Sequence, residues 1–332
     1  MVKRDPPEVA WARHLDRMIG AVLDTVPGND DIRSLRALGP CSADREGPSW
    51  MRIAFWLDAI WAAGDPGREP GGALADVLWG QYALFLSLRV KDDVLDGRRG
   101  DLRLLLVADR FLVESLRSFR RVRELGDAFW QSYLDCVQGT LDGAAEVGRL
   151  EAEPGAFRAE HLGLHARVAG MAKVGVAAVC HIHHKEAELA WLSHFQDHLA
   201  VANQIEDDLR DLADDLRVGR YTWVGNTLLA LRPGEVLSPD ERASRLGQGL
   251  LRPERSAAIA GLLRRTLRAA SAVVPASAPH HFSDLVQRLA AAPAEIERSL
   301  HETRVRWIFG QDLDAASPPS RPTNSPSSTS KA

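Results

Sequence analysis

The sequence has 332 residues, 45% of them hydrophobic and 26% charged, which is ordinary for a globular protein of one large domain or two smaller ones. The net charge of −4 and the lack of a basic block argue against nucleic acid as a partner. Three cysteines without motif spacing are typical of free thiols in a reducing compartment. No apolar run approaches the length of a membrane span, and the N-terminus becomes charged too early for a secretory signal. We therefore expect a cytoplasmic protein without stable membrane insertion.

Hydrophobic periodicity predicts helix along nearly the whole chain. A first amphipathic helix is expected at 8–23, because Pro6 and Pro7 precede it and proline suits a helix start. Residues 27–48 are rich in Gly, Pro, Asn and Ser and predict a loop. The remaining predicted helices cover 50–63, 73–96, 102–125, 127–147, 157–182, 185–217, 222–231, 239–250, 253–270 and 280–307.

No segment shows the alternating pattern of a half-buried strand. The final residues, 312–332, are dominated by Ser, Pro, Thr and Ala, a composition that favours disorder. The sequence therefore predicts a single all-α domain at 1–311, followed by a disordered tail.

An acidic motif stands at the end of the first long helix. The stretch KDDVLDGRRG contains Asp92, Asp93 and Asp96. In a helix Asp92 and Asp96 point the same way, and two like charges on one face repel each other unless a cation lies between them. A hard divalent cation, Mg²⁺ above all, takes oxygen ligands from carboxylates and from substrate phosphates. The motif thus indicates a magnesium site.

The same spacing returns in the stretch NQIEDDLRDLADDLRVGRYT, where Asp207, Asp208 and Asp211 repeat it. Helical geometry places Asp207 and Asp211 on one face, with Gln204 and Asp208 on the adjoining one. The two motifs are too far apart in the sequence to share a helix. Facing each other across a cavity, they could clamp several metal ions on one diphosphate.

Cations follow both motifs: Arg98 and Arg99 come after the first, and Arg220 comes after the second. Their planar guanidinium donors suit phosphate oxygens. A single acidic motif is also typical of a solvated surface helix. Two copies, each with its own basic residues, indicate a site for metal ions and a diphosphate.

These paired motifs, DDVLD with RRG and QIEDDLRD with GRYT, resemble the two aspartate-rich motifs of the trans-polyprenyl diphosphate synthases. The resemblance runs from about Trp50 to Ala230. It implies the class I isoprenoid synthase fold, an α-helical bundle around a central cavity. It also implies that three Mg²⁺ ions and basic side chains draw diphosphate from an allylic prenyl diphosphate substrate. Dimerisation is usual in this family, so a homodimer stays open for this chain.

The resemblance also implies roles for individual residues. The glutamine of the second motif corresponds to Gln204, and the basic residue after its glycine corresponds to Arg220. The family's lysine–threonine pair, which precedes the second motif, corresponds to Arg167 and Val168, with Lys173 as a rival substrate-binding cation. The implied metal ligands are Asp92, Asp96, Asp207 and Asp211, with Asp93 and Asp208 in support.

Two departures from the family pattern bear on function. Elongating synthases hold isopentenyl diphosphate with a Gly-Lys-Arg stretch, and Gly47, Pro48 and Ser49 stand in that register here. Both cations are therefore missing, although Arg45 or Arg52 could replace them. The loop before the two arginines of the first motif is also shortened to a single glycine, which could re-aim Arg98 and Arg99.

Three functions remain open. Ionising one prenyl diphosphate of fifteen or twenty carbons needs a single diphosphate site, and the cation would then cyclise, lose a proton or capture water, as in class I terpene synthases. This lyase is the first interpretation. The alternative is a prenyltransferase that condenses an allylic diphosphate with isopentenyl diphosphate or another acceptor. A non-catalytic subunit of a heteromeric synthase ranks last, because such a subunit could lose the aspartates that this chain retains.

The helix that ends in the first motif also supplies a candidate cavity wall. Counting back from Asp92 along its face gives Leu88, Phe85, Leu84 and Gln81. The π face of Phe85 could stabilise a carbocation, or the ring could serve only in core packing. We expect Phe85 and Leu88 to contact the substrate.

Overall fold

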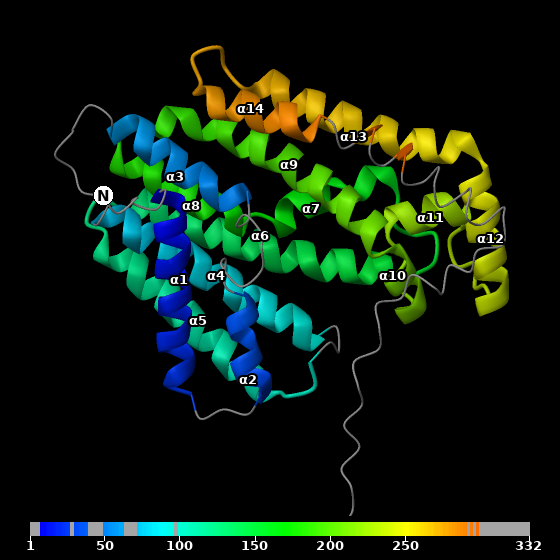
Figure 1. The fold of residues 1–332 in the computed structure, drawn as a ribbon, viewed down its shortest axis with the longest axis horizontal. Helices are drawn as coiled ribbons and strands as arrows, with labels where there is room; N and C mark the ends of the chain where they lie inside the picture. The colour runs from blue at the N-terminus through cyan, green and yellow to red at the C-terminus, as the bar shows by residue number, and fades with distance from the viewer. Residues whose placement is uncertain are drawn as a thin grey trace, which may run out of the picture.

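The computed structural model describes residues 7–26, 30–38, 49–62, 72–95, 99–290, 293–294 and 297–298. Every regular element within these ranges is a helix (Figure 1), so the all-α prediction is confirmed. The α-helices are α1 Pro7–Asp24, α2 Asp30–Ser34, α3 Ser49–Trp61, α4 Ala73–Leu95, α5 Arg103–Arg121, α6 Asp127–Glu151, α7 Gly163–Val168, α8 Met171–Ile182, α9 Leu189–Arg210, α10 Leu212–Val218, α11 Trp223–Leu229, α12 Pro239–Leu251, α13 Pro253–Val273 and α14 His280–Leu289. Short 3₁₀ turns are η1 Leu35–Leu38, η3 Ala159–His161 and η4 Glu186–Glu188.

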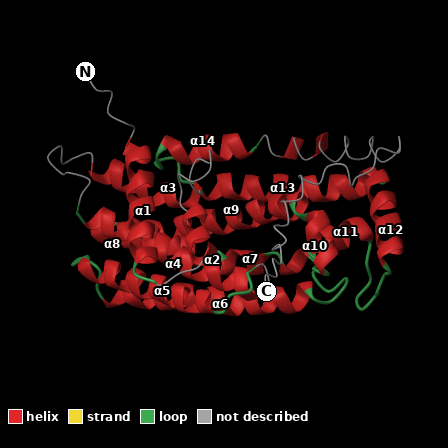
Figure 2. Cartoon of the chain, turned by 60° about the horizontal axis from the view of Figure 1, so that its bottom comes forward, coloured by secondary structure: helices red, strands yellow, loops and turns green. Residues whose placement is uncertain are grey.

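The helices stack in layers. Figure 2 shows α13 and α14 along one face and α5 and α6 along the opposite face, with α4, α8, α7 and α9 between them. The central helix α4 is apolar on most sides and buries residues all round, as expected for a helix enclosed in a core. Aromatic side chains join the layers: Phe119 of α5 packs against Phe129 and Tyr133 of α6, with ring centroids 5.3 and 5.7 Å apart. The core therefore surrounds the helix that carries the first motif.

The prediction of one continuous helix at 157–182 is wrong, because this segment forms η3, α7 and α8 in turn. The break falls at Ala169 and Gly170. Gly170 lies so close to α6 that a Cβ atom there would stand 3.1 Å from the Cys136 carbonyl oxygen. Periodicity alone did not reveal this break, since the apolar pattern continues through it.

Two other boundaries differ from prediction. The expected loop at 27–48 contains α2 and η1, which pack beside the first motif. The predicted helix at 185–217 divides at Asp211 into α9 and α10. The expected end of this segment at Gly219 is confirmed, because Gly219 adopts a left-handed conformation with φ of 79°, which glycine adopts without steric penalty.

No single described helix is long and apolar enough to cross a membrane. One bent pair, Ala159–Val168 with Met171–Ile182, passes such a test together, across a 53° bend. The predicted tail at 312–332 lies outside the described residues.

Candidate functional site

The first motif lies at the C-terminal end of α4. Asp92 is exposed there, with 54% of its side chain accessible, whereas only 7% of the Asp93 side chain is accessible. The carboxyl end of a helix dipole disfavours negative charge, so these carboxylates need cations nearby. Asp96 and Arg98, the other predicted members, lie outside the described residues.

Two guanidiniums hold the buried carboxylate of Asp93. Arg89, one turn earlier on α4, places Nη2 3.2 Å from Asp93 Oδ1. Arg99 returns from the following loop, where its Nε lies 3.3 Å from Asp93 Oδ2 and its backbone N–H donates to the Asp93 carbonyl at 3.0 Å. Arg99 Nη1 also donates to Ser34 Oγ of α2 at 2.6 Å. The predicted cation Arg99 is therefore positioned by the motif itself and by α2.

The second motif spans the junction of α9 and α10. Asp207 is exposed, and its Oδ1 lies 2.6 Å from Nη1 of Arg210. Asp211 stands between the two helices, also exposed, and its backbone N–H donates to the Asp207 carbonyl at 2.8 Å. Both predicted metal-binding carboxylates thus face outward at one helix end.

Asp208 is in a different environment from its neighbours. Its side chain is buried, with 1% of the residue accessible. Gln204 Nε2 donates to Oδ1 at 2.7 Å, while Oδ2 has no hydrogen bond of good geometry within the described residues. Burial raises the pKa of Asp208 to about 7; Gln204 and Thr222 oppose the shift, and the Asp215 carboxylate adds to it. A nearby cation would favour the ionised form of this buried carboxyl group, and Oδ2 is an oxygen atom that such a cation could bind.

Arg220, the predicted cation after the second motif, is turned toward acidic neighbours. Its Nε lies 3.7 Å from Glu151 Oε2 of α6, and its Nη1 lies 3.9 Å from Asp215 Oδ1. The Gly219 turn brings the Arg220 backbone N–H to the Asp215 carbonyl at 2.8 Å. These long ion pairs hold the guanidinium of Arg220 beside the second motif.

One electrostatic interaction links the two motif helices. Partial desolvation raises the pKa of the Asp207 carboxyl, although 54% of its side chain is accessible, and the positive charges of Arg210 and, to a smaller extent, of Arg89 oppose that rise. Arg89 belongs to α4 and Asp207 to α9, so the charge of one motif helix acts on the carboxylate of the other. The sequence analysis did not single out Arg89. The available signal was its spacing, since it precedes Asp92 and Asp93 by three and four residues on one helical face.

The donor set fits magnesium. The exposed carboxylates of Asp92, Asp207 and Asp211 and the free Oδ2 of Asp208 are all oxygen atoms, which are the ligands that Mg²⁺ prefers. At the first motif, Arg89 already pairs with the carboxylates of Asp92 and Asp93, at 3.7 and 3.2 Å. The residues present are therefore suited to the ion that the sequence predicts.

The other predicted substrate contacts lie on neighbouring helices. Phe85 and Leu88 are half-buried on α4, and the Phe85 ring packs on Tyr82 with centroids 5.7 Å apart. Arg167 is exposed on α7. Lys173 of α8 is engaged by Asp197 of α9 at 2.5 Å. A role in substrate binding stays a prediction for all four residues.

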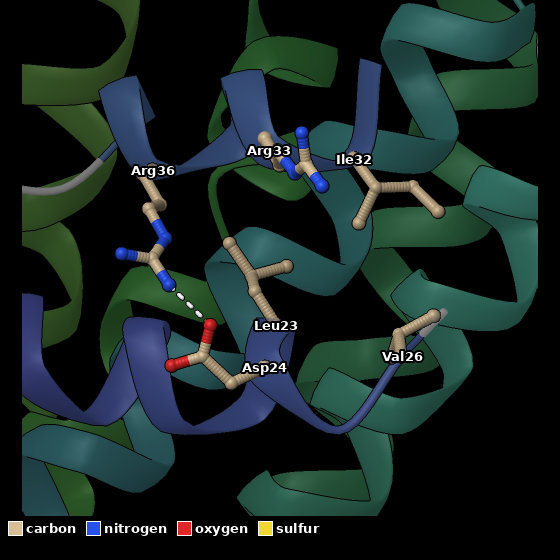
Figure 3. A pocket seen from close by; sticks show the side chains of 6 residues that line it. All are labelled: Leu23, Asp24, Val26, Ile32, Arg33 and Arg36. Carbon is tan, nitrogen blue, oxygen red and sulfur yellow. Dashed lines mark hydrogen bonds and ion pairs between the residues drawn. The ribbon is translucent and has the colours of Figure 1, made fainter. Parts of the chain in front are cut away.

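Two pockets in the described part of the chain lie away from this site. One, of about 170 Å³, is enclosed by α1, α2 and the start of η1, where Arg36 pairs with Asp24 (Figure 3). The other is an open hollow on the surface of α12. Neither of these two pockets is lined by a motif residue.

Three solved structures are similar to this chain. Heptaprenyl diphosphate synthase from Staphylococcus aureus aligns with a TM-score of 0.65 and 12% identity, over 88% of this chain and 99% of its own. A geranyltranstransferase from Methanosarcina mazei aligns with a TM-score of 0.52 and 13% identity, over 86% and 97%. A putative geranylgeranyl pyrophosphate synthase from Corynebacterium glutamicum gives 0.50 and 16%, over 91% and 96%.

No protein-family profile matches the chain, and no curated protein matches it in sequence. The structural similarity covers nearly the whole length of each of the three neighbours. The chain therefore has the all-α fold of polyprenyl synthase-like class I isoprenoid enzymes, as the resemblance of its motifs implied.

Proposed function

We propose that this chain binds an allylic prenyl diphosphate, breaks its carbon–oxygen bond with the help of Mg²⁺, and transfers the prenyl group to an acceptor. The observation that carries the proposal is that each acidic motif stands at the end of its helix with an exposed carboxylate close to an arginine: Asp92 with Arg89, and Asp207 with Arg210. Transfer to an acceptor is supported by the three structural neighbours, all named as enzymes that build prenyl chains.

The metal ions would be held by Asp92, Asp96, Asp207 and Asp211, with Asp93 and Asp208 in support. Their number, three, follows the family resemblance. When bound, they would neutralise the charge that develops on the departing diphosphate.

The residues of the chain position and balance this charge. Arg99 is fixed between Asp93 and Ser34, so its guanidinium needs little reorganisation to meet a phosphate oxygen. Arg220 lies close to Glu151 and Asp215 beside the second motif, and its positive charge would help to stabilise the departing diphosphate. Gln204 fixes the orientation of the Asp208 carboxyl.

A second candidate is a lyase of the class I terpene synthase type, which needs no acceptor. The specific observation in its favour is the sequence at Gly47, Pro48 and Ser49, which lacks the two cations of the isopentenyl diphosphate site. This stretch lies outside the residues whose side chains are described, as do Arg45 and Arg52. The lyase and the transferase share the first step and differ in the fate of the cation.

The deciding experiment incubates purified protein with Mg²⁺ and geranyl, farnesyl or geranylgeranyl diphosphate, with and without isopentenyl diphosphate. Diphosphate release is measured, and products are identified by mass spectrometry. A longer prenyl diphosphate that forms only with isopentenyl diphosphate supports the transferase. A hydrocarbon or alcohol formed without it supports the lyase.

The controls are two aspartate variants. Asp92→Ala removes a carboxylate of the site and should abolish either product. Asp214→Ala removes an exposed carboxylate that pairs with Arg217 at 2.7 Å, and it should leave turnover unchanged. If the wild-type protein releases no diphosphate from any of the three substrates, with or without the acceptor, the proposal fails.

A further inference from the structure

Three side chains that can ligate a metal ion gather at the start of α14, on the face of the bundle opposite α5 and α6 (Figure 2). They are His280, His281 and Asp284, and one ligand atom from each lies within 4.8 Å of the other two. We call these residues the His-His-Asp cluster. The cluster shares no residue with the acidic motifs. It offers two nitrogen ligands and one oxygen ligand, whereas the aspartates of the motifs offer oxygen alone.

Helical spacing brings the three side chains together. Asp284 follows His280 by four residues and His281 by three, so its carboxylate neighbours both imidazoles on the helix surface. The rings of His280 and His281 have centroids 4.1 Å apart. Within the described part of the chain, no hydrogen bond or ion pair occupies the nitrogen and oxygen atoms of the cluster. Their lone pairs are therefore available to an ion.

The helical turn that carries the cluster is fixed by the core. Phe282 is fully buried and packs on Trp191 and Phe195 of α9, with ring centroids 5.1 and 5.2 Å apart. Its backbone N–H donates to the Pro279 carbonyl at 3.1 Å, which closes the first turn of α14. Leu285 in the next turn is also buried. Because this backbone is anchored, the ligands lose less conformational freedom on binding an ion than ligands on a mobile loop would.

Trp56 of α3 orients one of the imidazoles. The Trp56 side chain is buried, and its ring stacks on the ring of His281, with centroids 5.5 Å apart and an interplanar angle of 23°. Stacking covers one face of the imidazole, whereas the lone pairs of its nitrogens lie in the plane of the ring. The contact therefore restricts rotation of the His281 ring without blocking its ligand atom. It also links the start of α14 to α3.

The ligand types select the class of ion. Imidazole nitrogen suits transition metal ions such as Zn²⁺, Ni²⁺ and Cu²⁺, whereas Mg²⁺ prefers oxygen ligands. Two imidazoles and a carboxylate, with water in the fourth position, form a tetrahedral zinc site. Ligand atoms on one zinc ion lie at most about 4 Å apart, since each is about 2.1 Å from the metal. The exposed side chains of His280 and Asp284 can rotate to close the remaining gap.

We infer that the His-His-Asp cluster binds one divalent transition metal ion, Zn²⁺ foremost, at a site separate from the Mg²⁺ site of the acidic motifs. The inference does not depend on the proposed function. The bound ion would cross-link the first turn of α14, because its ligands are three and four residues apart on one helix. It would thereby stabilise the contacts of α14 with α3 and α9.

The test titrates Zn²⁺ into metal-free protein and follows binding by calorimetry, with excess Mg²⁺ present to occupy sites made of oxygen alone. We expect one Zn²⁺ ion per chain at the cluster. His280→Ala and Asp284→Asn each remove a ligand at an exposed position and should weaken Zn²⁺ binding about tenfold or more. Zn²⁺ should also raise the melting temperature of wild type more than that of either variant. Circular dichroism of the metal-free variants checks that they are folded.

A paramagnetic ion locates the site. Cu²⁺ or Ni²⁺ bound to His281 should quench the fluorescence of Trp56, because the two rings are stacked. Trp56→Phe should remove this part of the quenching while the affinity changes less than about twofold. The matched control is His194→Ala, which removes an exposed histidine of α9 outside the cluster. It should change neither the affinity nor the quenching.

Equal Zn²⁺ affinity in wild type and in the folded His280→Ala and Asp284→Asn variants would overturn the inference. A wild type that binds no Zn²⁺ in excess Mg²⁺ would overturn it as well, because such competition is expected only at a site of carboxylates. Quenching that Trp56→Phe leaves intact would place the ion elsewhere, for example at the end of α8, where the rings of Trp61 and His183 have centroids 5.8 Å apart. That result, too, would contradict the inference.

Discussion

The two acidic motifs share one spacing and differ in how their buried carboxylate is compensated. Asp93 lies between the guanidiniums of Arg89 and Arg99, at 3.2 and 3.3 Å. Asp208 has a neutral amide as its close partner and the carboxylate of Asp215 nearby, and burial raises its pKa to about 7. The same three-aspartate pattern thus gives one buried carboxylate held by two arginines, Asp93, and one held by a neutral amide, Asp208.

The difference indicates where an added cation would matter most. At the first motif the protein already neutralises the buried charge with its own arginines. At the second motif, Arg210 forms an ion pair with the exposed Asp207, and Arg220 forms long ion pairs with Glu151 and Asp215. A divalent ion that ionises Asp208 would therefore gain more there than at Asp93, because an unpaired buried carboxylate is costly.

The largest expected effect tests whether the two motifs are nevertheless equal in catalysis. Asp92→Asn and Asp207→Asn should each slow Mg²⁺-dependent diphosphate release by about a thousandfold, or about 4 kcal/mol of barrier, because each removes an exposed carboxylate from the shared site. Asp214→Asn, on the following helix α10 and paired with Arg217, should change the rate less than about threefold. A large loss at only one motif would show that the other is not part of the site.

The second prediction concerns stability without metal and has opposite signs at the two motifs. Asp93→Asn should lower the free energy of unfolding by about 1–3 kcal/mol, because it leaves two partly buried guanidiniums without their carboxylate. Asp208→Asn should raise it by about 1–3 kcal/mol at pH 8, because it removes a buried charge without a cationic partner. Urea denaturation in a chelator measures both. If both variants changed the free energy of unfolding in the same direction, the proposed difference between Asp93 and Asp208 would be wrong.

The third prediction follows the pKa of Asp208. In the folded protein this pKa is about 7, above the usual value of about 3.9 in an unfolded chain. Between these values the folded state holds a proton that the unfolded state has released, so metal-free stability should fall as pH rises from about 4 to 7. The slope due to Asp208 is at most about 1.4 kcal/mol per pH unit. Subtracting the free energy of unfolding of Asp208→Asn from that of wild type at each pH isolates the contribution of Asp208. Saturating Mg²⁺ should make this contribution less dependent on pH. A difference independent of pH would rule this explanation out.

The smallest expected effect concerns Arg89, the cation that acts on both motifs. Arg89→Gln should lower metal-free stability by about 0.5–1 kcal/mol, with a larger loss at low salt, because the guanidinium is partly exposed and screened. Arg117→Gln, which removes an exposed arginine paired with Glu114 at 2.9 Å, is the matched control. Equal losses in both variants would mean that Arg89 contributes no more than an ordinary surface ion pair.

Much of the fold was predictable, because long amphipathic and apolar periods leave little alternative to helices. The long helix carrying the first motif was expected at 73–96 and extends over Ala73–Leu95. The break at Gly170 was missed, since the close contact of this residue with the Cys136 carbonyl of α6 involves a helix that lies elsewhere in the sequence. The helix α2 inside the expected loop was also missed. Its Ser34 contacts Arg99 across the fold, which no local pattern could reveal.

The sequence by itself determined the helical class, the two aspartate motifs and the oxygen-rich chemistry that suits magnesium, because residue type and spacing set these locally. Only the tertiary structure decided which carboxylates are exposed, that Asp93 lies between two arginines while Asp208 bonds the neutral amide of Gln204, and that Gln81 and Gln196 share one carbonyl. Burial and through-space charge depend on which helices pack together. Identical spacings in the sequence therefore acquired different electrostatic properties once the chain had folded.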